Sequence, residues 1–307
     1  MNETLILTLL TVITAATPLV YAAIGELVVE RSGVLNLGVE GMMLVGAVCA
    51  FATAHYTGAA SAGIIAGILS GMLMAGLFGF LTLTLQSSQV ATGLALTIFG
   101  VGVSALIGQP LVGVAYQGLH AFDIPFLSDI PLLGRLLFSH DILVYGSFAL
   151  VAAVALFLNH SRAGLVLRSV GDSHDAAHAL GIKVLRVRYL ATLFGGACAG
   201  LGGAYLSMVY TPMWVENMSS GRGWIALALV VFAVWQPGRL LLGAYLFGGI
   251  SILQLHGQAL GINVPSQLMS MLPYLTTIVV LVLMSRDRGR IRRNAPASIG
   301  RAFHPTT

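Results

Sequence analysis

The chain has 307 residues, of which 57% are hydrophobic and only 8% are charged. A soluble domain carries about 25% charged residues, so this composition excludes an ordinary soluble protein and indicates an integral membrane protein. The formal net charge is +4, and the two cysteines, Cys49 and Cys198, lie in apolar runs that indicate no disulfide framework.

Nine segments of the chain are apolar and long enough, or nearly so, to cross a membrane. A transmembrane helix needs about 20 mostly apolar residues. The candidate segments are residues 4–25, 41–57, 61–85, 90–113, 142–158, 189–211, 218–235, 240–258 and 266–284. The sequence therefore predicts an all-α polytopic membrane protein with about nine transmembrane helices, within a range of eight to ten.

The basic residues divide unequally between the two sides of this arrangement. Lys and Arg concentrate in the cytoplasmic loops of membrane proteins. With nine spans, 13 of the 15 Lys and Arg residues fall on one side, and only Arg135 and Arg222 fall on the other. We therefore expect the N-terminus outside and the C-terminus in the cytoplasm. Residues 1–285 are predicted to form a single membrane domain, and residues 286–307 a basic cytoplasmic tail.

The seventh segment is the weakest of the nine. Its continuous apolar part, from Trp224 to Trp235, would give only about 18 Å of helix. If residues 218–235 did not cross, the arginines of the tail would face outward, against the distribution of positive charge expected for membrane proteins. We therefore expect this segment to cross.

Two segments carry small residues at helical spacing. Bare helix faces of this kind allow two helices to approach closely. The residues concerned are Gly63, Gly67, Gly71, Ala75 and Gly79 in segment 61–85, and Gly196, Ala199, Gly200 and Gly203 in segment 189–211. Both segments are expected to pack against other helices through these faces.

The predicted cytoplasmic loop 159–188 contains the sequence HDAAH at residues 174–178. Two histidines four positions apart share a helix face, as in the HExxH motif of zinc proteases, so a membrane metalloprotease is one interpretation. Zinc catalysis usually needs a third protein ligand, however, and Asp175 is one methylene shorter than the Glu that acts as base. The favoured interpretation is a solvated pair on a short helix, with no metal and no cofactor bound by this chain.

The same loop carries start and stop signals for a short helix. Asp172 or Ser173 can accept hydrogen bonds from the first-turn amides, and Gly181 can take the left-handed conformation that ends a helix. A helix of about two turns is unstable alone in water, so packing must hold it. Its small apolar surface would suit a groove on another protein. The residues expected to form that surface are Ala176, Ala177, Ala179 and Leu180.

The chain does not contain the phosphate-binding loop of ATPases. Its only lysine is Lys183, and no glycine-rich run precedes it. A phosphate loop needs its lysine on the nucleotide phosphates. If ATP drives this protein, a partner must hydrolyse it.

The loop resembles a known motif. Asp175-Ala176-Ala177 followed by Gly181 is similar to the EAA…G loop of ABC-importer permeases, with Asp in place of the usual Glu. In that family the loop forms a coupling helix that docks on the ATPase. The resemblance therefore implies an ATPase-coupling role for Asp172, Ser173, His174, Asp175, Ala176, Ala177 and Gly181.

Three longer stretches resemble permeases of the ribose, nucleoside and branched-chain amino acid importers, and in particular their purine-nucleoside branch. They are ERSGVLNLGVEGMMLVGA (30–47), IPFLSDIPLLGRLLF (124–138) and GRGWIALALVVFAVWQPGRLLLGAYLFG (221–248). Together they extend from the second predicted span to the eighth, so the resemblance spans nearly the whole chain. The chain departs from the expected pattern at four places, which leaves the substrate open. These are Ser88 and Thr97 where Asn is expected, Arg135 where Pro is common, and Ala233-Val234 where Gly-Arg is expected.

The resemblance implies the permease subunit of an ATP-driven ABC importer, not an enzyme. Such a subunit forms half of a translocation pathway, here for nucleosides or purines, in the plasma (inner) membrane of a bacterium. The implied partners are a second, different permease, a cytoplasmic ATPase that binds ATP and Mg, and a periplasmic or lipid-anchored solute-binding protein. Membrane lipid is a further partner, and no nucleic acid is expected.

Polar residues in or near the spans are candidates for the translocation pathway. They are Asn36, Glu40, Gln89, Thr92 and Thr97. A carboxylate at the bilayer centre costs roughly 2.5–3.5 kcal/mol, so Glu40 is expected to face a polar partner or a wet cavity. Structural roles remain open for all five. Arg31 is expected to form an ion pair with Glu26 or Glu30 at the cytoplasmic edge.

Two alternatives remain open. The same architecture could import a sugar such as ribose, or a branched-chain amino acid. More distantly, the chain could be a secondary transporter or channel that works without any ATPase, in which case the helix at 172–181 would have no effect on transport.

Overall fold

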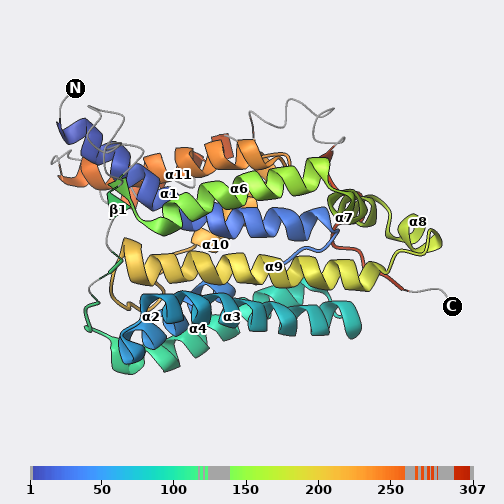
Figure 1. Ribbon diagram of the computed structural model, residues 1–307, viewed down its shortest axis with the longest axis horizontal. Helices are drawn as coiled ribbons and strands as arrows, with labels where there is room; N and C mark the ends of the chain where they lie inside the picture. The colour runs from blue at the N-terminus through green and yellow to red at the C-terminus, as the bar shows by residue number, and fades with distance from the viewer. Residues whose placement is uncertain are drawn as a thin grey trace.

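Long helices run side by side in one bundle in the computed structural model (Figure 1). The structure describes residues 3–116, 118, 119, 122, 123, 139–259, isolated positions between 267 and 282, and 294–304. The α-helices are α1 (Glu3–Arg31), α2 (Val39–Thr57), α3 (Ala60–Gly79), α4 (Gln89–Gly108), α6 (Ile142–His160), α7 (Arg162–Asp172), α8 (His174–Ala179), α9 (Val184–Tyr205), α10 (Arg222–Phe232) and α11 (Pro237–Ala259).

Shorter elements extend or join these helices. Two π-helical turns, η1 (Phe80–Thr84) and η3 (Leu206–Tyr210), continue α3 and α9, and a 3₁₀ turn, η2 (Gln109–Leu111), follows α4. Strands β1 (Phe122–Asp123) and β2 (Ser139–His140) pair antiparallel. The stretch 124–138, which carries part of the family resemblance, lies outside the described residues.

Six helices among the described residues are long and apolar enough to cross a membrane. They confirm the first six predicted spans, with boundaries that differ by a few residues. The largest difference is in the first span, which continues as helix from residue 25 to Arg31. Glu26 and Glu30 therefore lie inside α1, where both are buried, and not in a loop.

The seventh predicted span is not one continuous transmembrane helix. Helix α10 has 11 residues, which is about 16 Å at the helical rise. It ends in a turn in which Val234 and Trp235 both have φ +51°, and α11 follows with 23 residues. The predicted span 266–284 lies largely outside the described residues. The predicted count of nine spans and the direction of the termini are therefore not confirmed.

Helices α2, α3 and α9 pack at very short distances through glycines, as their spacing predicts. A Cβ atom on Gly71 would lie 2.2 Å from the carbonyl oxygen of Gly196, and one on Gly200 would lie 2.1 Å from that of Gly67. Any larger side chain would push the helices apart. Glycine faces of this kind allow close packing of helices in lipid, where the burial of apolar surface contributes little to helix association.

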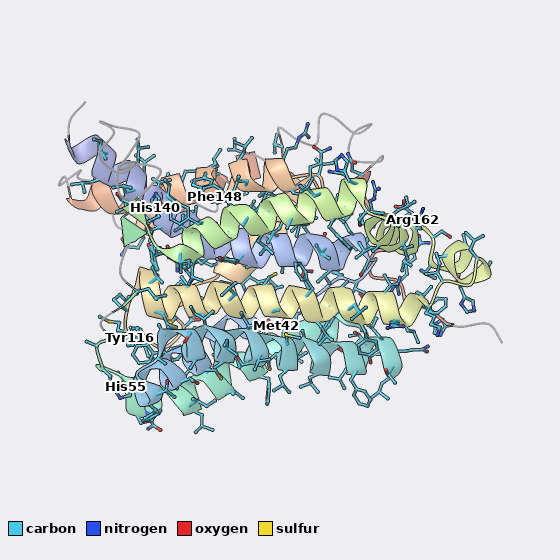
Figure 2. All side chains as sticks on the ribbon, in the orientation of Figure 1. Met42, His55, Tyr116, His140, Phe148 and Arg162 are labelled. Atoms are coloured by element: carbon cyan, nitrogen blue, oxygen red, sulfur yellow. The ribbon has the colours of Figure 1, made fainter. Side chains whose placement is uncertain are left out.

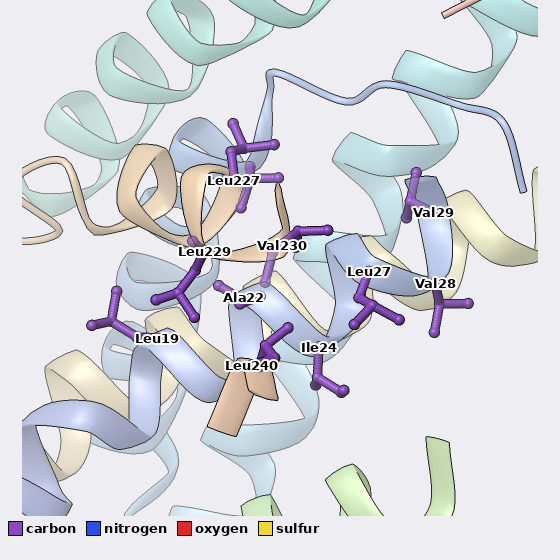
Figure 3. Close-up of a cluster of buried hydrophobic side chains, with 14 of the residues drawn as sticks. Leu19, Ala22, Ile24, Leu27, Val28, Val29, Leu227, Leu229, Val230 and Leu240 are labelled. Carbon is purple, nitrogen blue, oxygen red and sulfur yellow. The ribbon is translucent and has the colours of Figure 1, made fainter. Parts of the chain in front are cut away.

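The main apolar core includes residues from most helices of the bundle, among them α1, α10 and α11. Figure 3 shows Leu19 of α1 near Leu229 of α10, and Ile24 of α1 near Leu240 of α11. All are buried. This packing holds the half-length helix α10 inside the bundle.

The two ends of the bundle differ. Helix α7 lies across the helix axes and α8 projects beyond it at one end, which we call the α8 end; β1 and the start of α1 lie at the other (Figure 1). Figure 2 places Arg162 at the α8 end and His55, Tyr116 and His140 at the opposite end. Residues 294–304 pack at the α8 end, since Arg31, the last residue of α1, donates to the carbonyl of Asn294. The two described ends of the chain thus lie at opposite ends of the bundle.

Candidate functional site

Helix α8 has the start and stop signals that its sequence predicts. The Ser173 hydroxyl accepts from the N–H of Ala176 (3.3 Å), so Ser173 is the cap and Asp172 ends the preceding helix α7. Gly181 has φ +82°, and its N–H donates to the carbonyl of His178 (2.8 Å). Only glycine takes this conformation without strain, so the residue fixes where α8 ends.

One face of α8 packs on the bundle and the other is exposed. His174 and Ala177 are 8% and 2% exposed. Ala177 joins Phe303 in a small apolar cluster with Val170 and Val184. The expectation that Ala177 belongs to the outer surface is therefore wrong, because the register of the helix turns it inward. The exposed residues are Asp175, Ala176, Ala179 and Leu180, and Leu180 is 81% exposed.

Residues 294–304, here called the C-terminal strap, are packed against the bundle. The N–H of Ser298 donates to the carbonyl of Gly171 (2.8 Å), and the N–H of Gly300 donates to that of Gly33 (3.1 Å). The rings of His174 and His178 both lie edge-to-face on Phe303, with centroids 5.4 Å and 5.3 Å away. This part of the predicted basic tail is thus a bound segment beneath α8, while residues 286–293 lie outside the described residues.

Arg188 connects three segments at the α8 end. Its side chain is fully buried at the start of α9. Nε donates to the carbonyl of Ser32 after α1 (3.3 Å), and Nη1 donates to that of Arg301 in the strap (3.0 Å). Nη2 lies 3.2 Å from Nδ1 of His174 in α8. In the sequence, Arg188 is one of the basic residues of the predicted loop 159–188, although an arginine at the edge of an apolar span is itself a signal of a buried role.

The first histidine of HDAAH has protein partners at both ring nitrogens. Nδ1 of His174 accepts from a guanidinium, and its Nε2 lies 3.5 Å from the Asp175 carboxylate. Burial, then the charge of Arg188, lowers the pKa of His174 below its ordinary value of 6.5; Arg301 and His304 act in the same direction and Asp175 opposes them. A neutral His174 fits both contacts. Within the described residues, no group of three His, Cys, Asp or Glu could hold a metal ion.

The second polar site is the irregular segment 32–38 between α1 and α2. Oε1 of Gln89 accepts from the N–H of Leu35 (2.8 Å), and the hydroxyl of Thr97 donates to the carbonyl of Leu37 (3.0 Å). Backbone that leaves a helix inside a membrane must find such partners. These two pathway candidates on α4 therefore satisfy the backbone of this segment.

Asn36 and Thr92 are also bonded within the protein. Oδ1 of Asn36 accepts from the backbone N–H of Gly38 (3.0 Å), and the backbone N–H of Asn36 donates to Oε1 of Glu26 (3.2 Å). The hydroxyl of Thr92 lies 2.8 Å from that of Ser87. The structure thus gathers Asn36, Gln89 and Thr97 around segment 32–38 and places Thr92 on the same buried face of α4.

Glu40 caps the half-length helix α10. Its Oε1 accepts from the Ser219 hydroxyl (2.5 Å) and the N–H of Gly221 (2.8 Å), and its Oε2 accepts from the N–H of Gly223 (2.6 Å). The side chain is 4% exposed. A carboxylate is favourable at a helix N-terminus, where free N–H groups carry partial positive charge. Glu40 therefore has the polar partner that its position requires, and it fixes the irregular segment 211–221.

The expected ion pair of Arg31 is absent among the described residues. Arg31 donates instead to the carbonyls of Asn294 (2.9 Å) and Trp235 (3.1 Å). Glu30 accepts from the indole N–H of Trp235 (2.6 Å), and Glu26 from the backbone of segment 32–38. The two carboxylates point into the bundle, because they occupy its buried face, while the guanidinium lies at its end.

The chain is similar to known transport permeases over most of its length. The family model of the branched-chain amino acid transport system permease component matches residues 8–284. The chain is 40% identical to a putative glucose ABC transporter permease protein, TsgC13 of Haloferax volcanii, over 94% of this chain and 95% of that protein. It is 33% identical to the nucleoside ABC transporter permease protein NupC of Lactococcus lactis (87% and 89%) and 31% identical to the guanosine ABC transporter permease protein NupQ of Bacillus subtilis (87% and 88%).

Proposed function

The chain belongs to the family of permease components of branched-chain amino acid transport systems, and we propose that it forms half of the translocation pathway of an ATP-driven importer. As an ABC transporter permease it is a multi-pass membrane protein and a transport subunit, not an enzyme. The observation that carries the proposal is α8, a short helix fixed on its inner face and exposed on its outer face.

The outer face of α8 is suited to dock in a groove of the ATPase. Leu180, Ala176 and Ala179 are exposed there, and burying one leucine side chain stabilises an association by about 1.5–3 kcal/mol. The inner face is held by Ala177, Phe303 and the bond between His174 and Arg188. A displacement of α8 would therefore move the start of α9 and the strap with it.

Arg188 offers a route from α8 to the membrane helices. Its bond to Ser32 reaches the segment that Gln89 and Thr97 tie to α4. At the start of α2, Glu40 holds α10. Transporters form their solute and ion sites at irregular breaks of this kind between membrane helices. In the proposed mechanism of alternating access, ATP-driven closure of the partner displaces α8, and this contact chain opens and closes the pathway.

Several features follow from the proposal. The α8 end faces the cytoplasm, and the N-terminus lies on the outer side of the membrane. That membrane is the plasma membrane of a bacterium. The ATPase binds ATP and Mg. A second, different permease completes the pore, and a periplasmic or lipid-anchored protein delivers the solute. Because the five pathway candidates already have partners within the protein, that binding protein supplies most of the affinity.

We infer that the solute contains a sugar ring. A nucleoside is the first candidate, since the stretches 30–47, 124–138 and 221–248 resemble nucleoside permeases and two relatives are named for nucleoside or guanosine transport. A hexose is the second candidate, because the relative at 40% identity is named as a putative glucose permease.

Uptake into proteoliposomes tests this function. The complete complex, with ATP supplied on the ATPase side, should accumulate labelled guanosine or glucose only when the binding protein is present. The control is the same complex with a catalytically inactive ATPase, which should transport neither. Uptake at the full rate with the inactive ATPase would contradict the proposal and support a secondary transporter or channel.

A further inference from the structure

A polar cavity of about 270 Å³ lies at the α8 end, away from α8 itself. It is lined by the end of α1, the end of α6, helix α7, the turn from α10 into α11, and the first residue of the strap. Its two charged residues are Arg31 and Arg168, and none of its lining residues is acidic. None of its lining residues belongs to α8 or to segment 32–38.

The two arginines have hydrogen-bonding capacity that the described protein leaves unused. Nε of Arg31 and Nε of Arg168 are both buried with no acceptor among the described residues. Arg31 uses its other two nitrogens on carbonyls, whereas no hydrogen bond of Arg168 to a described residue is formed. Buried polar groups without partners are rare in native proteins, and water, an ion or a ligand can supply the partner.

The charges in the cavity are also unbalanced. The charge of Arg168 repels Arg31, and the charge of Asp172 attracts it. Neither arginine forms an ion pair with any described residue. The cavity also contains Pro237 and Gly238, the N-terminal residues of the 23-residue helix α11. A Cβ atom on Gly238 would meet nothing within 4 Å. Two guanidinium groups and a helix N-terminus around open space match a phosphate.

The surroundings favour a phosphate that is attached to a lipid. Leu156 of α6 and Leu242 of α11 are 61% and 72% exposed. They lie within about one helical turn of the lining residues Ala155 and Gly238. The acyl chains of a lipid can pack along these helices while its phosphate enters the cavity. Basic pockets between transmembrane helices on the cytoplasmic side bind anionic head groups in this way.

We propose that Arg31 and Arg168 bind the phosphate of an anionic phospholipid from the leaflet at the α8 end. The lipid phosphate would accept from both Nε–H groups and bridge α1 to α7. It would thereby replace the missing ion pair and link the membrane helices to the element that carries α8. This site goes beyond the transport function and requires only that the chain spans a membrane.

Lipid titration of the purified full-length chain in detergent tests the site. The probes are dioleoyl-phosphatidylglycerol and dioleoyl-phosphatidylcholine, and the readout is the lipid dissociation constant from native mass spectrometry. Wild type should prefer phosphatidylglycerol. Arg168→Gln should weaken that binding about tenfold, or about 1.4 kcal/mol. The matched control is Arg162→Gln, which removes the same charge from the same helix outside the cavity and should change binding less than about twofold.

A second variant keeps the test independent of Arg168. Gly238→Asp places a carboxylate in the open part of the cavity and should abolish the preference for phosphatidylglycerol while the chain stays folded. Equal effects of Arg168→Gln and Arg162→Gln, or no preference in wild type, would overturn the proposal. A third arm adds inorganic phosphate without lipid; thermal stabilisation by phosphate alone that Arg168→Gln removes would show that the ligand is free phosphate. No arm needs ATPase or solute, so a failure here leaves the transport function untouched.

Discussion

Replacing Glu40 tests whether this carboxylate is a helix cap or a solute ligand. It accepts three hydrogen bonds, two of them from backbone N–H groups at the start of α10. Glu40→Gln keeps one oxygen but puts an NH₂ group against the N–H of Gly223 or against Ser219 and Gly221. Because one buried donor then loses its acceptor, we expect a loss of about 1–3 kcal/mol. Glu40→Ala leaves both backbone donors unpaired and should cost about 2–6 kcal/mol.

Thermal and denaturant unfolding of the purified chain measures these losses. The matched control is Glu216→Gln, which removes a carboxylate from the same irregular segment at an exposed position and should change stability by less than about 0.5 kcal/mol. If Glu40→Gln unfolds like wild type and changes only which solute is transported, the cap interpretation is refuted and Glu40 is a pathway ligand.

Three further predictions concern packing, coupling and pH. Gly200→Ala should destabilise the chain by about 1–3 kcal/mol, because its Cβ would clash with Gly67, while Gly102→Ala, which faces open space, should not; unfolding curves that coincide for the two would contradict the close packing. Arg188→Lys loses two of three contacts at about 1.5–3 kcal/mol each, so solute uptake per ATP hydrolysed should fall in the reconstituted complex; an unchanged ratio would exclude Arg188 from the contact chain. His174 has a lowered pKa in the folded state, so its contribution to stability should be full above about pH 6.5 and decrease as the pH falls through the lowered pKa; His174→Gln should flatten this dependence in melting experiments, and an unaltered slope would contradict it.

Much of the fold can be predicted from hydropathy and spacing. The first six spans follow from apolar length, and the glycines of α3 and α9 mark the faces that meet. Hydropathy misplaced only the end of the first span, where Glu26 and Glu30 end the apolar run but continue the helix, because their partners lie elsewhere in the bundle. It failed at residues 211–235, where an irregular segment and a half-length helix depend on the distant Glu40.

In the candidate site too, features that depend on local sequence could be predicted, and features that depend on distant residues could not. The caps of α8 are local, so Ser173 and Gly181 could be identified from the sequence. Which side of α8 is exposed depends on Phe303, more than 120 residues away in the chain, and no local pattern places Ala177 inside. Arg188 and the strap were missed for the same reason, since their partners come from three separate segments.

The most direct test of the central claim is a change at Leu180, the residue that caps the C-terminus of α8 and is 81% exposed. In the reconstituted complex, Leu180→Glu should leave the permease folded but lower solute-stimulated ATP hydrolysis and uptake together by about tenfold or more, because a groove that would bury the leucine must then accept a charge. The matched control Leu180→Met keeps an apolar side chain of similar size and should retain both activities. If Leu180→Glu binds the ATPase and transports like wild type, α8 is not the element through which ATP hydrolysis drives this permease.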